Sequence, residues 1–199
     1  MEKDERPVRR TGAETREAIL VSARRAFAEH GYDGAGVREI AAGAGVTAML
    51  VNRYFGSKEN LFSEVIAATM ASPTILTAEN LASSDLARTM ATVLVRITRG
   101  QDTPLDGFLI MLHSSSSKRA AEIGRRQIEQ GHQNTMTRAL SGALAPERAA
   151  LILSIVAGFQ VMRQMIGLSA LTEAEPEALV ELITPLFAVL IEGSPRCSG

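Results

Sequence analysis

Residues 31–62 read GYDGAGVREIAAGAGVTAMLVNRYFGSKENLF, and this stretch decides the fold. It holds two helical patterns, Val37 to Ala44 and Thr47 to Phe55, separated by a Gly45-Val46 turn and each too short for an independent helix. Thr47 and Ser57 are well placed as N-caps. The apolar residues that can fix the two short helices at a steep angle are Ile40, Ala41, Val46, Leu50 and Val51. This pattern predicts a helix-turn-helix at about residues 36–55.

Helices are also predicted on both sides of this stretch. Thr11 and Glu14 form a capping box, which begins a first amphipathic helix that Gly31 ends. A further helix is expected from Lys58 to about Met70, with Leu61, Phe62, Val65 and Ile66 as its apolar stripe. The first three of these helices are therefore expected to form a three-helix helix-turn-helix domain, whose bounds at residues 13–70 include the further helix from Lys58. An unpacked arm at residues 1–12 is expected before it.

Composition places the chain among soluble globular proteins. It has 199 residues, of which 46% are hydrophobic and 22% charged. Lys and Arg number 21 against 22 Asp and Glu, a net charge of -1, so any DNA binding must come from locally placed charges. The charged start and the lack of a window of roughly 18 apolar residues predict a cytoplasmic protein that does not span a membrane. The single Cys197 excludes an intramolecular disulfide framework.

The remaining residues, 71–199, also show helical patterns, and the boundary is placed at Ser72-Pro73. Thr103-Pro104 is expected to start one helix, and a long helix is expected from about Ser117 to Leu140. The last two helices, from Pro146 and from the Thr172 capping box, are apolar around most of their circumference. The fold class predicted is all-α, with a C-terminal helical domain for ligand binding and dimerisation.

The quoted stretch resembles the DNA-binding domain of the tetracycline-repressor-type (TetR) transcriptional regulators. The resemblance covers about residues 13–66 and rests on Ile19-Leu20, Phe27, Gly31-Tyr32, Ile40-Ala41, Gly45-Val46-Thr47, Tyr54-Phe55 and Ser57-Lys58-Glu59. It implies a homodimeric repressor whose C-terminal domain binds a small molecule and then releases DNA. Many relatives have other residue types in place of Ala48 and Asn52, so the operator sequence does not carry over.

The physical chemistry of the second short helix agrees with DNA binding. A recognition helix begun at Thr47 would place its first turns in the major groove. Arg53 can pair with guanine and Asn52 with adenine, while Ala48 and Met49 offer apolar contact to a thymine methyl. The residues expected to face DNA are Arg38, Thr47, Ala48, Met49, Asn52, Arg53, Tyr54 and Lys58. The alternative for Arg53 and Lys58 is a pair of solvated surface charges.

Two further sets of residues are predicted in the C-terminal part. A pocket for a small, largely apolar effector would use adaptable thioethers and aromatic rings, although ordinary core packing explains the same residues. Its candidates are Met90, Phe108, Met111, His113, Met136, Phe159 and Met162. A homodimer interface on the last two helices is predicted from their excess of apolar surface, the alternative being the core of a monomer. Its candidates are Leu151, Ile155, Gly158, Met162, Leu179, Ile183, Leu186 and Leu190.

Enzyme and cofactor functions find little support. The motif GAGVTA at residues 43–48 fits a loose dinucleotide fingerprint, but no strand pattern precedes it. His113 and the following serines lack the nucleophile-elbow pattern, and the histidines lack metal-ligand spacing. The sequence therefore predicts no catalytic residues, no metal and no cofactor. The favoured function is a repressor released by its ligand from a palindromic operator, and the alternative is a regulator of the same fold that acts through a protein partner.

Overall fold

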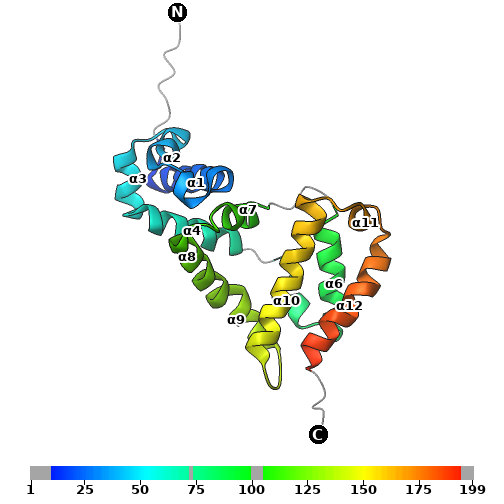
Figure 1. Ribbon diagram of the computed structural model, residues 1–199. Helices are drawn as coiled ribbons and strands as arrows, with labels where there is room; N and C mark the ends of the chain where they lie inside the picture. Colours follow the sequence, from blue (N-terminus) through cyan, green and yellow to red (C-terminus); the bar gives the residue numbers. More distant parts are fainter. Residues whose placement is uncertain (1–9, 72–73, 100–104, 194–199) are drawn as a thin grey trace, which may run out of the picture. The chain divides into compact units, whose positions relative to one another are not determined.

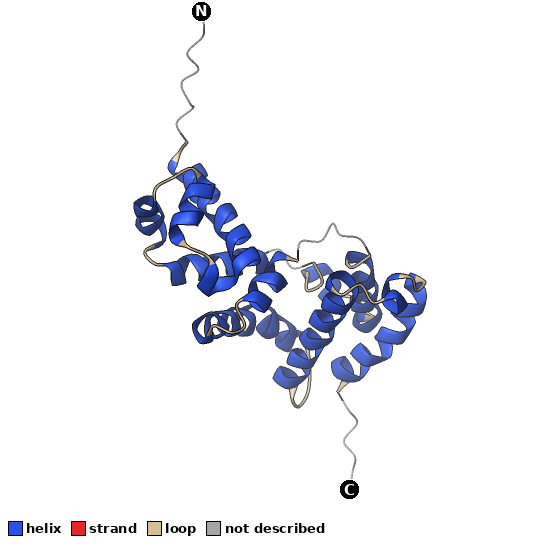
Figure 2. Ribbon diagram, turned by 45° about the horizontal axis from the view of Figure 1, so that its top comes forward, coloured by secondary structure: helices blue, strands red, loops and turns tan. Residues whose placement is uncertain are grey.

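The computed structural model describes residues 10–71, 74–99 and 105–193. All the secondary structure in these residues is helical, which confirms the all-α prediction (Figure 2). In chain order, the helices up to residue 113 are α1 (Gly12–Gly34), α2 (Val37–Ala44), α3 (Ala48–Phe55), α4 (Lys58–Met70), α5 (Ala78–Leu81), α6 (Leu86–Ile97) and α7 (Asp106–His113). The helices after residue 113 are α8 (Lys118–Ile128), η1 (Glu129–Gln133), α9 (Asn134–Ala139), α10 (Ala145–Gln160), η2 (Val161–Met165), α11 (Ser169–Thr172) and α12 (Pro176–Glu192) (Figure 1).

The chain forms two compact units that are not continuous in sequence. The first unit combines the described residues up to Ala68 with Leu109–Gly124, and the second combines Thr69–Phe108 with the described residues from Arg125 onward. The predicted domain boundary between residues 70 and 71 differs from this division. Leu109–Gly124 comes after that boundary in the sequence but packs with the N-terminal helices. The expected boundary at Ser72-Pro73 and the helix start at Thr103-Pro104 lie outside the described residues.

The first unit is built on α1, whose start was predicted correctly. Thr11 and Glu14 form the capping box, and the side chain of Glu14 accepts from the backbone N–H of Thr11 at 2.7 Å. Gly31 interrupts the helix with φ +66°, a conformation that favours glycine. Phe27 before this glycine and Tyr32 after it both pack on Phe62 of α4, with ring centroids 5.0 Å apart in each pair.

Helices α1 and α2 approach each other closely at Gly43. A Cβ atom there would lie 2.4 Å from the hydroxyl of Ser22, which is closer than real contacts allow. The same hydroxyl donates to the carbonyl of Ile40 at 2.8 Å. Gly43 is therefore required by packing, which gives the GAGVTA motif a structural explanation that involves no dinucleotide.

The segment Leu109–Gly124 is held to the end of α1 by several polar contacts. The backbone N–H of Tyr32 donates to the buried hydroxyl of Ser114 at 2.9 Å, and the hydroxyl of Ser117 donates to Asp33 at 3.3 Å. A Cβ atom at Gly31 would lie 2.3 Å from the backbone oxygen of His113. Ser114 and Ser117 lie between α7 and α8 and carry these contacts to α1.

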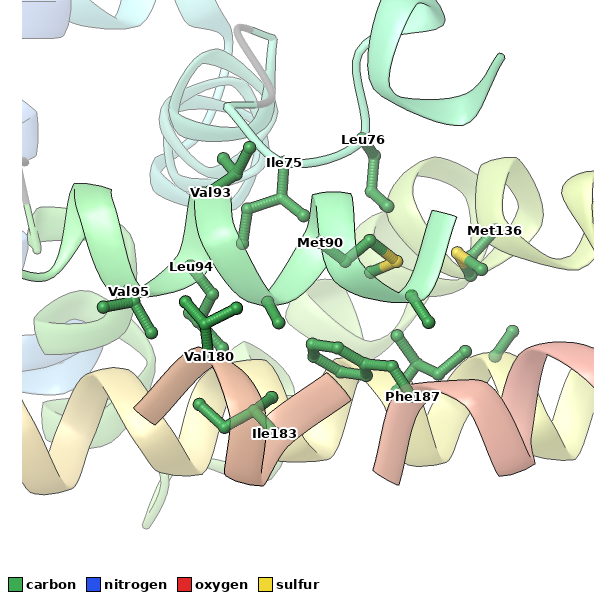
Figure 3. Close-up of a cluster of buried hydrophobic side chains, with 14 of the residues drawn as sticks. Ile75, Leu76, Met90, Val93, Leu94, Val95, Met136, Val180, Ile183 and Phe187 are labelled. Atoms are coloured by element: carbon green, nitrogen blue, oxygen red, sulfur yellow. The ribbon is translucent and has the colours of Figure 1, made fainter. Parts of the chain in front are cut away.

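The second unit is centred on α6, which packs against α12, while α12 also packs against α10. Figure 3 shows Val180, Ile183 and Phe187 of α12 together with Met90 and Leu94 of α6 in one buried apolar cluster. Met136 of α9 belongs to the same cluster. These side chains repeat every three or four residues along each helix, so each helix buries one stripe.

Two buried arginines satisfy helix ends in the second unit. Arg148 donates to the carbonyls of Leu190 and Ile191 at the end of α12, at 3.0 and 3.1 Å. Arg163 donates to the carbonyl of Val95 and to the hydroxyl of Thr98 at the end of α6, at 2.9 and 3.0 Å. The last carbonyls of a helix lack intrahelical partners, and a guanidinium at that end is favoured by the helix dipole.

Two helix predictions need correction. The long helix expected from Ser117 to Leu140 is the run α8, η1 and α9, whose π-helical segment contains Gly131 and His132. The last helix does not start at a Thr172 capping box. Thr172 ends α11, and α12 begins at Pro176 with Glu175 as its N-cap residue.

The expectation that no segment is long and apolar enough to cross a membrane is also corrected. The run Ala145–Met165, which joins α10 and η2, passes that test of length and composition with a mean hydropathy of 1.3. Only 22% of its most apolar window is buried. The run therefore carries apolar surface that this chain leaves exposed.

Candidate nucleic-acid interface

The turn between α2 and α3 is fixed by local hydrogen bonds. Gly45 ends α2 in the left-handed region with φ +69°, and its N–H donates to the carbonyl of Ala42. The N–H of Val46 donates to the carbonyl of Ala41 at 2.9 Å. The hydroxyl of Thr47 then accepts from the N–H of Leu50 at 3.3 Å, which confirms Thr47 as the N-cap of α3.

Helix α3 buries one face and exposes the other. Val51 and Phe55 are buried within the first unit. Met49 is 79% exposed, and Asn52 and Arg53 are also exposed. A single exposed apolar side chain is ordinary on a protein surface, so the feature that matters is the exposed amide and guanidinium donors beside it. The structure thus brings Met49, Asn52 and Arg53 to one outward side of the helix.

The other predicted DNA-facing residues differ in the exposure of their side chains and in the contacts that these side chains already make. Arg38 is exposed on α2, and Ala48 and Tyr54 are half-buried on α3. The hydroxyl of Thr47 is used by its cap. Lys58 is half-buried at the start of α4, with its ammonium 4.8 Å from the centre of the Tyr32 ring and 3.5 Å from the carbonyl oxygen of Asp33. Sequence reasoning missed this contact because 25 residues separate Lys58 from Asp33.

Arg10 is a further residue beside the turn, which the sequence assigned to an unpacked arm. Its guanidinium donates to the carbonyl of Ala44, the last residue of α2, at 2.7 Å. The signal available in the sequence was the capping box that starts one residue later, since a capped helix fixes the direction of the chain just before it. Arg10 thus contacts the turn through this hydrogen bond although residues 10–12 are exposed, and residues 1–9 lie outside the described residues.

Acidic side chains of α4 are neutralised by arginines of the first unit. Glu64 pairs with Arg16 of α1, and Glu59 pairs with Arg119 of α8 at 2.7 Å. The hydrogen bond from Arg119 lowers the pKa of Glu59, so that carboxylate is ionised at neutral pH. Both pairs are partly exposed, so they contribute little to stability. They place a compensating cation beside each of two carboxylates that would otherwise repel a phosphate backbone.

The residues predicted to line an effector pocket are divided between the two units. Met111 and His113 belong to the first unit, where Nδ1 of His113 lies 2.6 Å from the carbonyl oxygen of Ala28. Met90 and Met136 are buried in the core of the second unit, with Phe159 packed against it. A cavity of about 460 Å³ in the second unit includes none of the predicted residues. Its lining is Glu79, Asn80, Asp85, Arg88, Thr89, Thr92, Val93 and Arg96.

The predicted interface residues on α10, η2 and α12 also divide into two groups. Leu151, Gly158 and Met162 are exposed, as is Leu186, while Ile155 and Leu190 are half-buried. Leu179 and Ile183 were wrong, because both are buried against α6 within the same chain. The exposed stripe of α12 instead consists of Leu182, Leu186 and Val189. These three residues and Ile183 lie on different sides of α12. A helix that is apolar on all sides does not reveal from its sequence which side is buried.

Comparison with protein families decides what kind of protein carries this arrangement. The profile described as "Bacterial regulatory proteins, tetR family" matches residues 19–65. A second profile, described as "Tetracyclin repressor-like, C-terminal domain", matches residues 84–191, more than half of the chain. The chain belongs to the TetR family. Members of this family are DNA-binding transcription regulators and not enzymes, so this TetR-family chain is a regulator too.

Curated relatives match mainly the helix-turn-helix region of this TetR-family chain. The HTH-type transcriptional repressor AcnR of Corynebacterium glutamicum is 50% identical over 48 residues, which are 24% of this chain and 26% of that protein. AcnR of Corynebacterium diphtheriae is 42% identical over 65 residues, 33% of this chain and 34% of that protein. The chain thus spans between a quarter and a third of the length of the curated relatives it matches.

Solved structures resemble the chain over nearly its whole length. A TetR-family regulator from Streptomyces coelicolor has a TM-score of 0.60 at 22% identity, covering 94% of this chain and 100% of that one. NalD, the secondary repressor of the MexAB-OprM multidrug efflux pump in Pseudomonas aeruginosa, has a TM-score of 0.64 at 20% identity, covering 92% and 100%. At these identities the likeness establishes the TetR fold of both parts of the chain.

Proposed function

We propose that this protein represses transcription by binding a specific duplex DNA site through α3. The observation that carries the proposal is the exposure of Asn52 and Arg53 on the outward side of a capped, rigidly connected α3. Arg53 can donate two hydrogen bonds to guanine and Asn52 can pair with adenine in the major groove. Met49, 79% exposed, can meet a thymine methyl.

The contacts that position the protein on DNA come from residues around α3. Arg38 on α2 is exposed and can reach a phosphate, as can the hydroxyl of Tyr54. The first backbone N–H groups of α4 offer a phosphate site, and Lys58 contributes positive charge near it. These contacts set affinity and register, while the base contacts set specificity.

A homodimer would present two copies of α3 to a palindromic site. The support is the exposed apolar stripe of α12 (Leu182, Leu186 and Val189) and the exposed positions of α10 and η2 (Leu151, Gly158 and Met162). Contiguous exposed apolar surface marks an interface in soluble proteins, and two helices pairing with their symmetry mates give a four-helix bundle. We assign the exposed face of Ala145–Met165 to this interface and infer a cytoplasmic protein, although a membrane segment passes the same composition test.

An effector would act through the C-terminal part, proposed as the regulatory and dimerisation domain at residues 71–199. We propose that a small, largely apolar molecule binds there and weakens DNA binding by favouring a dimer geometry in which the two α3 helices no longer fit successive grooves. Leu109–Gly124 belongs to this stretch of sequence but packs with the DNA-binding helices, so it offers a physical connection between the two functions. A regulator that acts through a protein partner remains the alternative.

The proposal is tested by selecting bound sequences from a random duplex pool with the full-length protein. We expect a palindrome whose half-sites lie about 34 to 36 Å apart, or a multiple of that distance, and an affinity that falls steeply with salt concentration. A pool that yields no enriched sequence would contradict the repressor and favour the protein-partner alternative.

A further inference from the structure

We infer that the cavity of about 460 Å³ in the second unit binds a short peptide whose amino and carboxyl ends are both free. The cavity is lined by α5, by the N-cap of α6 and by one stripe of α6. Its volume lies within the range of about 300 to 1,000 Å³ that is typical of ligand pockets. None of its lining residues is a candidate for the apolar effector, so the inference goes beyond the proposed function and does not depend on it.

The cavity follows the side of α6 that faces away from the apolar core. Arg88, Thr92 and Arg96 recur every four residues on this side and are exposed, whereas Met90 and Leu94 of the same helix are buried in the core. The N-cap residue Asp85 and the last-turn residue Arg96 mark the two ends of the stripe, about 16 Å apart along the helix axis. The lining is therefore long enough for an extended ligand that lies along the helix.

Helix α5 forms the wall beside the N-terminal half of α6. In Figure 3 the chain from Ile75 to Leu76 runs towards that half, and α5 follows Leu76. The hydroxyl of Thr77 accepts from the N–H of Asn80 at 3.1 Å, and the side-chain amide of Asn80 donates to the carbonyl of Ile75 at 2.8 Å. These bonds fix α5 and the chain before it, so a ligand would not have to order this wall.

The connection between α5 and α6 is also held by side chains of the cavity. The hydroxyl oxygens of Ser83 and Thr89 are 2.7 Å apart, and Oδ1 of Asp85 accepts from the N–H of Arg88 at 3.0 Å. The guanidinium of Arg88 pairs with Glu177 of α12. These groups shape the cavity and already have partners within the second unit.

Three other lining side chains are available to a ligand. Glu79, Thr92 and Arg96 form no side-chain hydrogen bond or ion pair with any residue that the structure describes. Glu79 on α5 lies at the acidic end of the cavity, together with Asp85, whereas Arg96 lies at the other end. An ionised carboxylate only accepts hydrogen bonds and a guanidinium only donates them. The cavity therefore offers acceptors at one end and donors at the other.

A short peptide matches this arrangement at both ends and between them. Its ammonium can donate to Glu79 and to the second oxygen of Asp85, and its carboxylate can accept two hydrogen bonds from Arg96. The hydroxyl of Thr92 both donates and accepts, as the amide groups of a peptide require. Three or four extended residues span roughly 10 to 14 Å, and the side chains of Asp85 and Arg96 can cover the remainder of the stripe.

The test is isothermal titration calorimetry of the full-length protein with tetraalanine and with its N-acetylated, C-amidated and doubly blocked forms. We expect saturable binding of tetraalanine at millimolar concentration or below, and about tenfold weaker binding when either end is blocked, because each block removes a charge-assisted hydrogen bond. Absence of saturable binding overturns the inference, as does equal binding of the doubly blocked peptide. No DNA is present, so failure of this inference leaves the proposed repressor untouched.

Substitutions at the two ends assign each end of the peptide to its residue. Glu79→Gln should weaken binding of tetraalanine about tenfold and leave binding of the N-acetylated form unchanged, while Arg96→Gln should do the same for the free carboxylate and the C-amidated form. The matched controls are Glu181→Gln and Arg99→Gln, which change exposed charges of the second unit outside the cavity and should bind like the unaltered protein. Circular dichroism checks that all four variants are folded. Equal weakening of free and blocked peptides, or weakening by the controls, overturns the assigned site.

Discussion

The backbone N–H of Tyr32 donates to the hydroxyl of Ser114 at 2.9 Å and joins residues 82 positions apart in the sequence. Ser114 is almost completely buried in the turn between α7 and α8. Tyr32 lies just after the glycine that breaks α1, where its N–H has no helical acceptor. This bond therefore ties Leu109–Gly124 to the helices that carry α3, and it explains why the compact units are not continuous in sequence.

Replacing Ser114 with alanine should destabilise the first unit. The change leaves the buried N–H of Tyr32 without an acceptor, which costs about 1 to 3 kcal/mol. Urea denaturation followed by circular dichroism measures the effect. Ser116→Ala, an exposed serine in the same turn, is the matched control and should change the free energy of unfolding by less than about 0.5 kcal/mol. Equal stability of the two variants would show that the Tyr32 N–H finds another partner.

Gly31 should tolerate no side chain. Gly31 has φ +66° and ψ −178°, a conformation essentially restricted to glycine, so alanine there costs about 1 to 3 kcal/mol. Its Cβ would also lie 2.3 Å from the backbone oxygen of His113. We expect Gly31→Ala to lower the thermal unfolding temperature clearly. Gly131→Ala is the control, because no atom lies within 4 Å of a Cβ at that site. A Gly31→Ala protein as stable as the Gly131→Ala protein would contradict the close approach of α1 and His113.

Sequence reasoning succeeded where structure is determined locally. The capping box at Thr11, the glycine stop at Gly31, and the turn at Gly45 followed by the Thr47 cap all depend on residues within five positions of one another. The same is true of the outward side of α3, since one buried stripe determines the opposite face of a short helix.

Sequence-based prediction failed where contacts between residues far apart in the sequence determine the structure. The packing of Ser114 on Tyr32 and the contact of Lys58 with Asp33 join residues that no local pattern pairs. On α12 both faces are apolar, so the sequence could not tell that Ile183 packs on α6 while Leu186 is exposed. The effector candidates were chosen by residue type alone, and the structure divides them between two units.

Leu186 and Ile183 of α12 allow the proposed dimer interface to be distinguished from the core of the second unit. Leu186 is 53% exposed and Ile183 only 6%. We expect Leu186→Glu to give a folded monomer that loses operator binding, because the charge is placed on the proposed dimer face. Ile183→Glu should unfold the second unit, since it buries a charge among apolar side chains. Sedimentation velocity at micromolar concentration, with circular dichroism on the same samples, measures both outcomes. A Leu186→Glu protein that remains dimeric would contradict the assigned interface.

Mild acid should destabilise the second unit through His132. Burial lowers the pKa of this imidazole below its ordinary 6.5, so below about pH 6.5 the unfolded chain binds more protons than the folded one. The stability contributed by the neutral ring is complete above about pH 6.5 and decreases as the pH falls further. We expect the difference in unfolding free energy between about pH 7.5 and pH 5.5 to be smaller for His132→Gln than for the unaltered protein. An identical difference would show that His132 is solvated.

We propose that α3 reads bases through Arg53, and the base preference of Arg53→Ala tests this role directly. Titrations compare the selected duplex with duplexes changed at single positions, using Arg38→Ala as the control because its exposed guanidinium is assigned to a phosphate. Lys58 is less suitable, since its ammonium already contacts Tyr32 and Asp33. The account predicts that Arg53→Ala loses roughly 1 to 3 kcal/mol of discrimination at one base pair per half-site, whereas Arg38→Ala weakens all duplexes about equally. An Arg53→Ala protein with unchanged base preference would contradict it.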